Sequence, residues 1–226
     1  MQTHTMTARN SQANAAPAIV RPAAHAMGET VELMGAVMPF PRNAEIYGEN
    51  EPAEYLYKVV GGAIRTYRVL NDGRRQIGAF YLPGDVFGIE VGDLHTFSAE
   101  SIVDSKVMLI KRSSLLALAA RSADVARQLW TMAATELQRA QDHTMLLIKT
   151  AQERVAGFLL EMAKRAPHAN AVELPMSRQD IADYLGLTIE TVSRTLTQLE
   201  NSAAIEVPTS RRIVLRNQAA LSRLNS

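Results

Sequence analysis

The chain has 226 residues with a formal net charge of +1, of which 47% are hydrophobic and 21% charged, so it can bury a sizeable core and is neither wholly disordered nor collagen-like. It contains no cysteine, which excludes disulfides, thiolate zinc sites and cysteine-ligated iron–sulfur clusters. No apolar run is long enough to span a membrane, and the small net charge means that any nucleic-acid binding must depend on a local site. These features favour a cytoplasmic protein.

Residues 1–27 are rich in Ala, Thr, Asn, Gln and Pro and show no hydrophobic periodicity. They have no continuous apolar stretch, so they do not resemble a signal peptide. A polar segment of this kind cannot bury enough apolar surface to fold alone. The composition therefore predicts a flexible N-terminal tail, with a short interaction arm as the alternative.

Residues 53–108 have the pattern of β-structure. The apolar runs at 55–60 and 63–70 flank a Gly-Gly pair, which predicts a tight hairpin. Many short strands at regular spacing indicate a sandwich, a roll or a barrel. Turns are predicted at Asn71-Asp72-Gly73 and Pro83-Gly84-Asp85, because these residues tolerate the backbone angles that turns require. Further strands are predicted at residues 75–81, 98–103 and 106–111.

The pattern changes from strand to helix near residue 112. A short helix is predicted from Ser113 and Ser114 onward, with a serine as its N-cap, because a serine hydroxyl can accept from the free N–H groups of the first turn. Residues 123–148 then contain neither Gly nor Pro. They predict a single helix of about 39 Å at 1.5 Å per residue.

One stripe of this long helix recurs at alternating spacings of four and three residues. That period predicts a seam against a second helix, so we expect a homodimer that pairs along it. The alternative is a helix that packs only on the core of its own domain, and a neighbouring stripe from Val125 to Leu146 leaves the register open. The predicted seam residues are Ala126, Trp130, Ala133, Leu137, Ala140, Thr144 and Leu147.

Residues 151–165 predict another amphipathic helix, and residues 177–196 follow the pattern of a helix-turn-helix. Ser177 can cap the first helix of this pattern. Ala182 is small where the second helix crosses, and Gly186 supplies the turn at a point where a Cβ atom would clash. Val192 anchors the second helix inward. Beyond it, residues 204–207 and 212–216 flank Pro208-Thr209-Ser210 and predict the wing of a winged helix.

The outward residues of the second helix predict binding to double-stranded DNA. Arg194 can form two hydrogen bonds to a guanine edge, and Glu190 can accept one from a cytosine or adenine amino group, with Ser193 beside them. The alternative for Glu190 and Arg194 is an exposed i,i+4 ion pair. Residues near helix starts and in the wing are expected to position phosphates, although the wing arginines could also be merely solvated. These residues are Ser177, Arg178, Thr188, Thr191, Arg211 and Arg212.

The chain combines a predicted β-roll, a long helix and a winged helix. It also contains two specific motifs, Gln152-Glu153-Arg154-Val155-Ala156 and Glu190-Thr191-Val192-Ser193-Arg194. This combination resembles the cyclic-AMP receptor protein / fumarate–nitrate reduction regulator superfamily over residues 28–226. Without cysteines, the chain is closest to its FixK-type regulators. The resemblance implies an α+β fold with four parts. These are a tail at 1–27, a β-roll like a cyclic-nucleotide-binding domain at 28–122, a dimerisation helix at 123–148 and a winged helix-turn-helix domain at 149–226.

The resemblance also implies a function. It predicts a homodimeric transcription regulator, an activator that contacts RNA polymerase and acts in low-oxygen or nitrogen-fixation-related gene control. In the family, a Glu-x-x-Ser-Arg set reads a half-site similar to TTGAT, so the expected operator resembles TTGAT-N4-ATCAA. The competing hypothesis from another class is a binding module whose helical tail has lost DNA binding.

The chain departs from the family where cyclic nucleotides bind. Residues 87–90 read Phe-Gly-Ile-Glu, and residues 96–99 lack the arginine that would pair with a cyclic phosphate. We therefore expect no cofactor and a regulator that needs no nucleotide. Glu90 is expected to be a solvated loop acid, with a displaced ribose contact as the alternative. The alternative is an effector-gated sensor that holds a small ligand, or a haem with His95 or His143 as axial ligand, in the roll. No metal spacing or catalytic triad stands out, so we expect no metal site and no enzyme.

Overall fold

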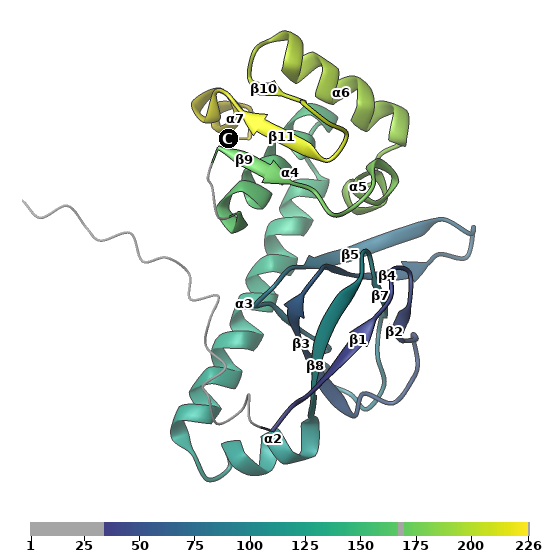
Figure 1. Cartoon of the computed structure of the whole chain (residues 1–226), viewed down its shortest axis with the longest axis vertical. Helices are drawn as coiled ribbons and strands as arrows, with labels where there is room; N and C mark the ends of the chain where they lie inside the picture. Colours follow the sequence, from purple (N-terminus) through teal and green to yellow (C-terminus); the bar gives the residue numbers. More distant parts are fainter. Residues whose placement is uncertain (1–33, 167–169, 226) are drawn as a thin grey trace, which may run out of the picture.

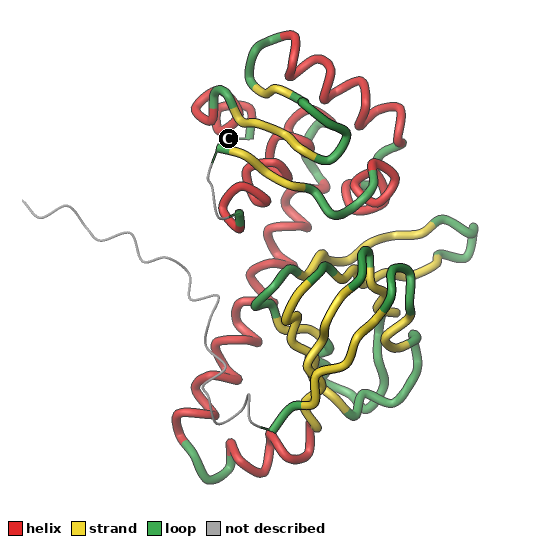
Figure 2. Tube along the Cα trace, viewed as in Figure 1, coloured by secondary structure: helices red, strands yellow, loops and turns green. Residues whose placement is uncertain are grey.

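The computed structural model describes residues 34–166 and 170–225, so the tail predicted at 1–27 lies outside the described residues. A β-roll, a long helix beside it and a winged-helix domain follow one another along the chain (Figure 1). The roll consists of strands followed by helices, whereas the winged helix contains both in alternation (Figure 2). This arrangement confirms the α+β class. Within the described part of the chain, no helix is long and apolar enough to cross a membrane.

The β-roll consists of two four-stranded antiparallel sheets that share one apolar core. The strand orders are β1-β8-β3-β6 and β2-β7-β4-β5. Aromatic residues from both sheets, among them Tyr57 on β3 and Tyr81 on β5, meet Phe87 in this core. The strands are β1 (Ala36–Phe40), β2 (Glu45–Tyr47), β3 (Tyr55–Gly61), β4 (Ile64–Val69), β5 (Arg75–Tyr81), β6 (Val86–Phe87), β7 (Ser98–Ser101) and β8 (Ser105–Lys111).

The hairpin predicted around the Gly-Gly pair is wrong. β3 pairs with β6 and β8, whereas β4 pairs with β5 and β7, so Gly61 and Gly62 carry the chain from one sheet to the other. Gly62 has a φ of +88°, and a Cβ atom there would lie 2.6 Å from the Cα of Ser105. The N–H of Ala63 donates to the Ser105 hydroxyl at 3.1 Å. This close backbone approach, rather than a hairpin, is the reason for glycine.

The two other predicted turns are confirmed. Asn71-Asp72-Gly73 joins the antiparallel pair β4 and β5, with a φ of +81° at Gly73. Gly84 has a φ of +97° in the turn before β6. Strands β1 and β2 are not predicted by the sequence pattern, because β1 is an edge strand with almost every residue exposed and so lacks an apolar alternation.

The helices between the roll and the winged helix match the prediction except at one cap. α2 (Arg112–Ala119) follows β8 without a break, and its N-cap is Lys111, without a side-chain cap. The N–H of Arg112 donates instead to the carbonyl of Glu54 at 2.8 Å, so the predicted serine cap is wrong. α3 (Ala123–Leu147) is the predicted long helix and runs beside the roll (Figure 1).

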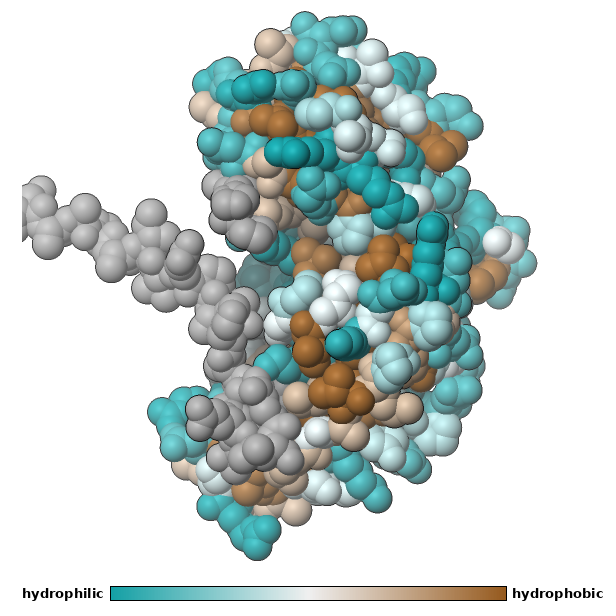
Figure 3. All heavy atoms as spheres, in the orientation of Figure 1, coloured by the Kyte–Doolittle hydropathy of each residue, from teal (hydrophilic) through white to brown (hydrophobic). Residues whose placement is uncertain are grey.

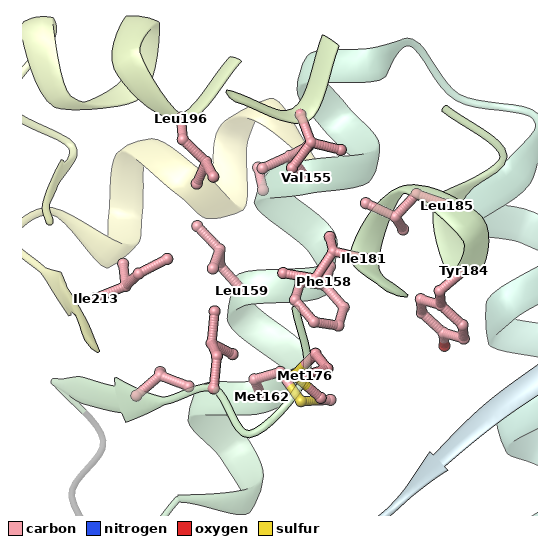
Figure 4. Packing of buried hydrophobic residues seen from close by; sticks show 14 of the residues in the cluster. Val155, Phe158, Leu159, Met162, Met176, Ile181, Tyr184, Leu185, Leu196 and Ile213 are labelled. Carbon is pink, nitrogen blue, oxygen red and sulfur yellow. The ribbon is translucent and has the colours of Figure 1, made fainter. Parts of the chain in front are cut away.

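The winged-helix domain packs around α4 (Ala151–Arg165), which begins with a capping box between Thr150 and Glu153. Side chains of α4 such as Phe158 and Leu159 are fully buried and meet α5 and α6 (Figure 4). The wing hairpin is confirmed, and β9 and α7 are additions that the pattern does not predict. The remaining elements are β9 (Ala171–Glu173), α5 (Arg178–Leu185), α6 (Ile189–Asn201), β10 (Ile205–Glu206), β11 (Arg212–Leu215) and α7 (Gln218–Leu224).

The apolar core of the winged helix continues into the roll. Phe80 on β5 is buried, and its ring lies 5.1 Å from Tyr184 on α5 and 6.2 Å from Phe158 on α4. Ile77 joins Phe80 in this core, whereas Tyr81 of the same strand belongs to the core of the roll. Both faces of β5 therefore carry buried apolar side chains.

Gly62→Ala should destabilise the roll by about 1–3 kcal/mol or more, because alanine is strained at positive φ and its Cβ atom would press on the Ser105 backbone. Gly73→Ala is the matched control, since Gly73 also has positive φ but has open space around it. Urea denaturation of both variants separates the clash from the strain. Equal destabilisation would show that the contact with Ser105 is unimportant.

Candidate nucleic-acid interface

The helix-turn-helix has the geometry that its sequence predicts. Ser177 caps α5, accepting from the N–H of Asp180 at 3.1 Å. Gly186 ends α5 in the left-handed region with a φ of +61°, which confirms the predicted turn. The predicted clash is wrong, because a Cβ atom there would lie 3.5 Å from its nearest neighbour, Arg154 Nη1, so the positive φ is the reason for glycine. Ala182 and Val192 are both fully buried between the two helices. α6 therefore crosses α5 with its apolar side inward and its polar side exposed.

The three residues predicted to read bases lie on the exposed side of α6. Glu190, Ser193 and Arg194 are all exposed within one turn of each other. Among the ion pairs of the described residues, none joins Glu190 to Arg194, so the exposed i,i+4 pair considered as an alternative is not formed. Both charged groups are free to meet base edges.

The hydroxyl groups predicted to meet phosphates divide into two situations. Thr188 caps α6 and accepts from the N–H of Thr191 at 3.2 Å, so both threonines lie at the positive end of the α6 dipole. The Ser177 hydroxyl instead donates to the Asp180 carboxylate at 2.7 Å. Its proton is therefore used inside the protein.

The three predicted phosphate-positioning arginines also differ. Arg211 donates to the carbonyl of Pro175 at 2.5 Å and is half-buried, whereas Arg212 is exposed and lies 3.6 Å from Glu173. Arg178 is half-buried, with one guanidinium nitrogen buried without a partner, and this burial lowers its pKa. Arg212 is thus the most accessible of the three.

The two stripes of α3 face different surroundings. The stripe from Val125 to Leu146 packs against the roll and α4, and Tyr81 on β5 donates to Glu136 in it at 2.6 Å. The predicted seam lies about a quarter turn away around the helix. Its side chains are exposed except for the half-buried Leu147, with Trp130 at 76% and Leu137 at 60% exposure. Compared with this stripe, the molecular face shown in Figure 3 is mostly hydrophilic, and its hydrophobic residues form small patches.

A cavity of about 310 Å³ lies between the roll and α3. Its lining includes Phe87, Phe97 and Glu90, and no lysine or arginine is among the described residues that line it. Glu90 accepts from the N–H of Thr96 at 3.1 Å and its side chain is only 12% exposed. The expectation of a solvated loop acid is therefore wrong: the carboxylate holds the loop together.

The two histidines considered as haem ligands are both packed against tyrosines. His95 stacks on Tyr47 with the ring centroids 3.5 Å apart, and its Nδ1 lies 3.5 Å from Glu90. His143 stacks on Tyr184 at 4.0 Å and donates from Nε2 to the Tyr184 carbonyl at 2.8 Å. Burial lowers the pKa of both imidazoles. Among the residues that the structure describes, no group of three His, Asp or Glu side chains could hold a metal ion.

The fold and the exposed polar side of α6 together define a transcription regulator with a helix-turn-helix. Family models agree: residues 153–224 match the Crp-like helix-turn-helix domain, and residues 37–122 match the cyclic nucleotide-binding domain. Because the relatives are transcription regulators, the expectation that the chain is not an enzyme is confirmed.

The chain belongs to the FixK-type regulators of the cyclic-AMP receptor protein / fumarate–nitrate regulator family. It is 51% identical to the nitrogen fixation regulation protein FixK of Azorhizobium caulinodans, over 88% of this chain and 82% of that protein. It is 40% identical to the Rhizobium meliloti protein of the same name, over 83% of this chain and 86% of the relative. The structure of FixK2 from Bradyrhizobium japonicum superimposes with a TM-score of 0.82 at 55% identity, covering 85% of this chain and 98% of that one.

The sequence pattern misses the contacts that join the winged helix to the roll. Arg65 and Arg75 on adjacent roll strands meet Asp180 on α5, and Tyr184 on α5 meets His143 on α3. These groups are scattered along the chain and belong to no motif. The strand β4 contains two arginines, Arg65 and Arg68, and only the structure shows that Arg65 is the buried one, so the sequence carries no clear signal for these contacts.

His143→Gln should reduce the loss of stability on acidification. Because burial lowers the pKa of His143, the unfolded chain takes up this proton more readily, and stability falls as the pH drops below the unfolded pKa of about 6.5. Glutamine keeps a donor for the Tyr184 carbonyl but does not titrate. Urea denaturation between about pH 7 and about pH 5 measures both slopes. His95 contributes equally to both proteins. Identical slopes of stability against pH in the wild type and the variant would therefore contradict a lowered pKa at His143.

Proposed function

We propose that the chain is a homodimeric activator of transcription that works in the cytoplasm, binds a palindrome resembling TTGAT-N4-ATCAA and contacts RNA polymerase. The observation that carries the proposal is the exposed and mutually unpaired set of Glu190, Ser193 and Arg194 on α6. The names of the FixK relatives support a role in nitrogen-fixation gene control. The division into parts at 28–122, 123–148 and 149–226 belongs to the same proposal.

Base reading is assigned to α6. Arg194 meets guanine O6 and N7 in the major groove, and Glu190 accepts from the amino group of a neighbouring base, with Ser193 between them. Thr188 and Thr191 approach a phosphate at the α6 N-terminus. Arg212 approaches a second phosphate from the wing. Ser177, Arg178 and Arg211 are assigned to phosphate positioning as well, although Ser177 and Arg211 also form hydrogen bonds within the protein and Arg178 is half-buried.

Dimerisation is assigned to the exposed stripe of α3. Large apolar side chains such as Trp130 and Leu137 are rarely left in water over several turns of a helix, so a second copy of α3 is the partner that this stripe fits. The other members are Ala126, Ala133, Ala140, Thr144 and Leu147. Two protomers are also what a palindrome requires, because two recognition helices must enter major grooves about 34–36 Å apart.

DNA binding without a nucleotide is supported by the cavity of the roll. Its described lining holds the carboxylates of Glu90 and Glu136 but no cation, so a cyclic phosphate would find no guanidinium partner. The effector-gated alternative keeps one supporting observation, the cavity itself, which has room for a small uncharged ligand. Operator binding by the purified protein, with and without added cyclic nucleotide, separates the two functions.

Arg194→Ala should weaken operator binding by about 1–3 kcal/mol and relax the preference for guanine at one position of the half-site. The physical reason is the loss of a bidentate contact to O6 and N7. Fluorescence anisotropy with operators that carry each base at this position measures both effects.

The matched control is Arg223→Ala, which removes one exposed positive charge from α7 and leaves α6 intact. It should bind all these operators with the wild-type order of preference. A guanine preference that survives in Arg194→Ala would assign base reading to another residue.

Leu137→Glu should yield folded monomers with little operator affinity, because two carboxylates would then face each other in an apolar seam. Thr135→Glu is the control, since Thr135 is exposed on roughly the opposite side of α3 and should leave the dimer intact. Sedimentation and circular dichroism report oligomeric state and folding. A Leu137→Glu protein that remains dimeric would place the interface elsewhere.

A further inference from the structure

A buried carboxylate lies between the roll and the helix-turn-helix. Asp180, in the first turn of α5, is only 3% exposed. Its Oδ1 accepts from Nη1 of Arg65 at 2.9 Å and from Nη2 of Arg75 at 2.7 Å. The arginines belong to β4 and β5 of the roll, so Asp180 joins elements more than a hundred positions apart in the chain.

The two oxygens of this carboxylate have different tasks. Oδ2 completes the capping box of α5, accepting from the N–H of Ser177 at 2.9 Å and from its hydroxyl at 2.7 Å. Oδ1 is not needed for the cap and, among the described residues, accepts hydrogen bonds only from the two arginines of the roll. The start of α5 and the two roll strands are therefore fixed to the same group.

A second carboxylate extends the contact. Asp183, one turn further along α5, accepts from Nε of Arg75 at 2.8 Å. Beside it, the side-chain amide of Gln76 donates to the carbonyl of Tyr184 at 3.3 Å. One planar group of Arg75 thus faces two carboxylates: Nη2 lies 2.7 Å from Asp180 and 2.8 Å from Asp183, and Nε also donates to Asp183. This arrangement restricts rotation of α5 on the roll as well as its distance.

The burial of these charges makes the arrangement specific. Arg65 and Asp180 have side-chain exposures of 9% and 4%. A buried charge is stable only with its partners in place. A winged helix that shifted on the roll would remove both arginines from Asp180, and Arg65 would keep only Glu100 on β7, 2.9 Å away. Apolar contacts such as Phe80 with Tyr184 allow small slides at little cost, whereas ion pairs of this kind do not.

The covalent path from the roll to α5 is long: it runs along α3, through residues 148–150, and back through α4. On this path α4 also meets the roll, because Arg165 donates to the Phe80 carbonyl at 3.0 Å and pairs with Asp85. The contacts of Asp180 and Asp183, by contrast, act on α5 itself.

If α3 supplies the dimer axis, the distance between the two recognition helices depends on where α5 and α6 sit relative to α3. The roll is held against α3 by Arg139, which lies 3.0 Å from Asp85. A contact that fixes α5 on the roll therefore also fixes α5 relative to α3.

We propose that Arg65 and Arg75 are positioning residues for DNA recognition. Through Asp180 and Asp183 they set the placement of α5 and α6 on the roll, and this placement selects the spacing between the two half-sites of the operator. The inference rests on the proposed palindromic function. It assigns base identity to α6 and half-site spacing to an ion cluster that joins α5 to the roll.

The first test compares operators whose half-sites are separated by N3, N4 and N5. Arg75→Gln should weaken binding to the N4 operator by about tenfold. It should change binding to the N3 and N5 operators by less than about twofold, so that discrimination by spacing declines while base preference within each half-site stays.

Asp183→Asn gives the sharper result of the same test. Removing an acidic group from a DNA-binding protein ordinarily raises its affinity for DNA, because repulsion of the phosphates falls. The positioning role predicts the opposite for the N4 operator, a loss of several-fold. The double variant should bind no more weakly than Arg75→Gln alone, because the two residues act through one contact.

Arg74 and Asp72 provide the matched control pair. They form a similar ion pair at 2.7 Å on the neighbouring turn, but it is exposed, and among the described residues no hydrogen bond or ion pair joins it to the winged helix. Arg74→Gln and Asp72→Asn should keep the wild-type spacing preference. Parallel weakening on all three operators in Arg75→Gln would indicate a merely structural role and overturn the proposal, as would unchanged N4 binding.

A second measurement needs no operator and so remains valid if the palindrome itself is wrong. The chain has no cysteine, so Val91→Cys on the roll and Gln198→Cys on α6, both exposed positions, accept nitroxide labels selectively. The labelled protein is mixed with an excess of unlabelled, cysteine-free chain that is otherwise identical, so that most dimers contain one labelled protomer. Pulsed electron paramagnetic resonance then reports the distance between the two labels within that protomer. Arg75→Gln or Asp183→Asn should broaden a narrow wild-type distribution, and Arg74→Gln should not. A distribution unchanged in Arg75→Gln would overturn the proposal.

Discussion

The position of the recognition helix depends on the contact between the roll and α5, and the centre of that contact is the carboxylate of Asp180. The group is held from two sides, by the cap of its own helix and by two arginines of the roll. Around it, Phe80 and Tyr184 bury apolar surface, and His143 binds the Tyr184 carbonyl. Apolar burial supplies most of the attraction, while the ion pairs make one orientation much more favourable than its neighbours.

The long helix α3 separates the tasks of the molecule by the side on which a residue lies. One stripe belongs to the protomer: Leu146 packs into the core of the winged helix, and Glu136 accepts from Tyr81 of the roll. The stripe a quarter turn away is left to a second copy in the proposed dimer. Since the roll and the dimer partner would contact the same rigid helix, a change in either can reach the winged helix without any change in α6 itself.

The sequence predicts most of the DNA-binding domain because local rules determine it. Ser177 as a cap, Gly186 as a left-handed turn and Val192 as an inward anchor each follow from a single residue type at one spacing. The contacts between domains escape prediction because they join residues such as Arg65 and Asp180 that share no local pattern. For the same reason Gly62 is read as a hairpin glycine, although its role is set by Ser105 on a distant strand.

The most direct test of the account is the stoichiometry of the wild-type protein on a full palindrome and on an isolated half-site, without any nucleotide. Light scattering coupled to size exclusion should find two protomers on TTGAT-N4-ATCAA, formed by a protein that is already dimeric, and much weaker binding to the half-site. A complex with one protomer bound tightly, or binding to the palindrome only after a cyclic nucleotide is added, would contradict a constitutive dimer that reads DNA through α6.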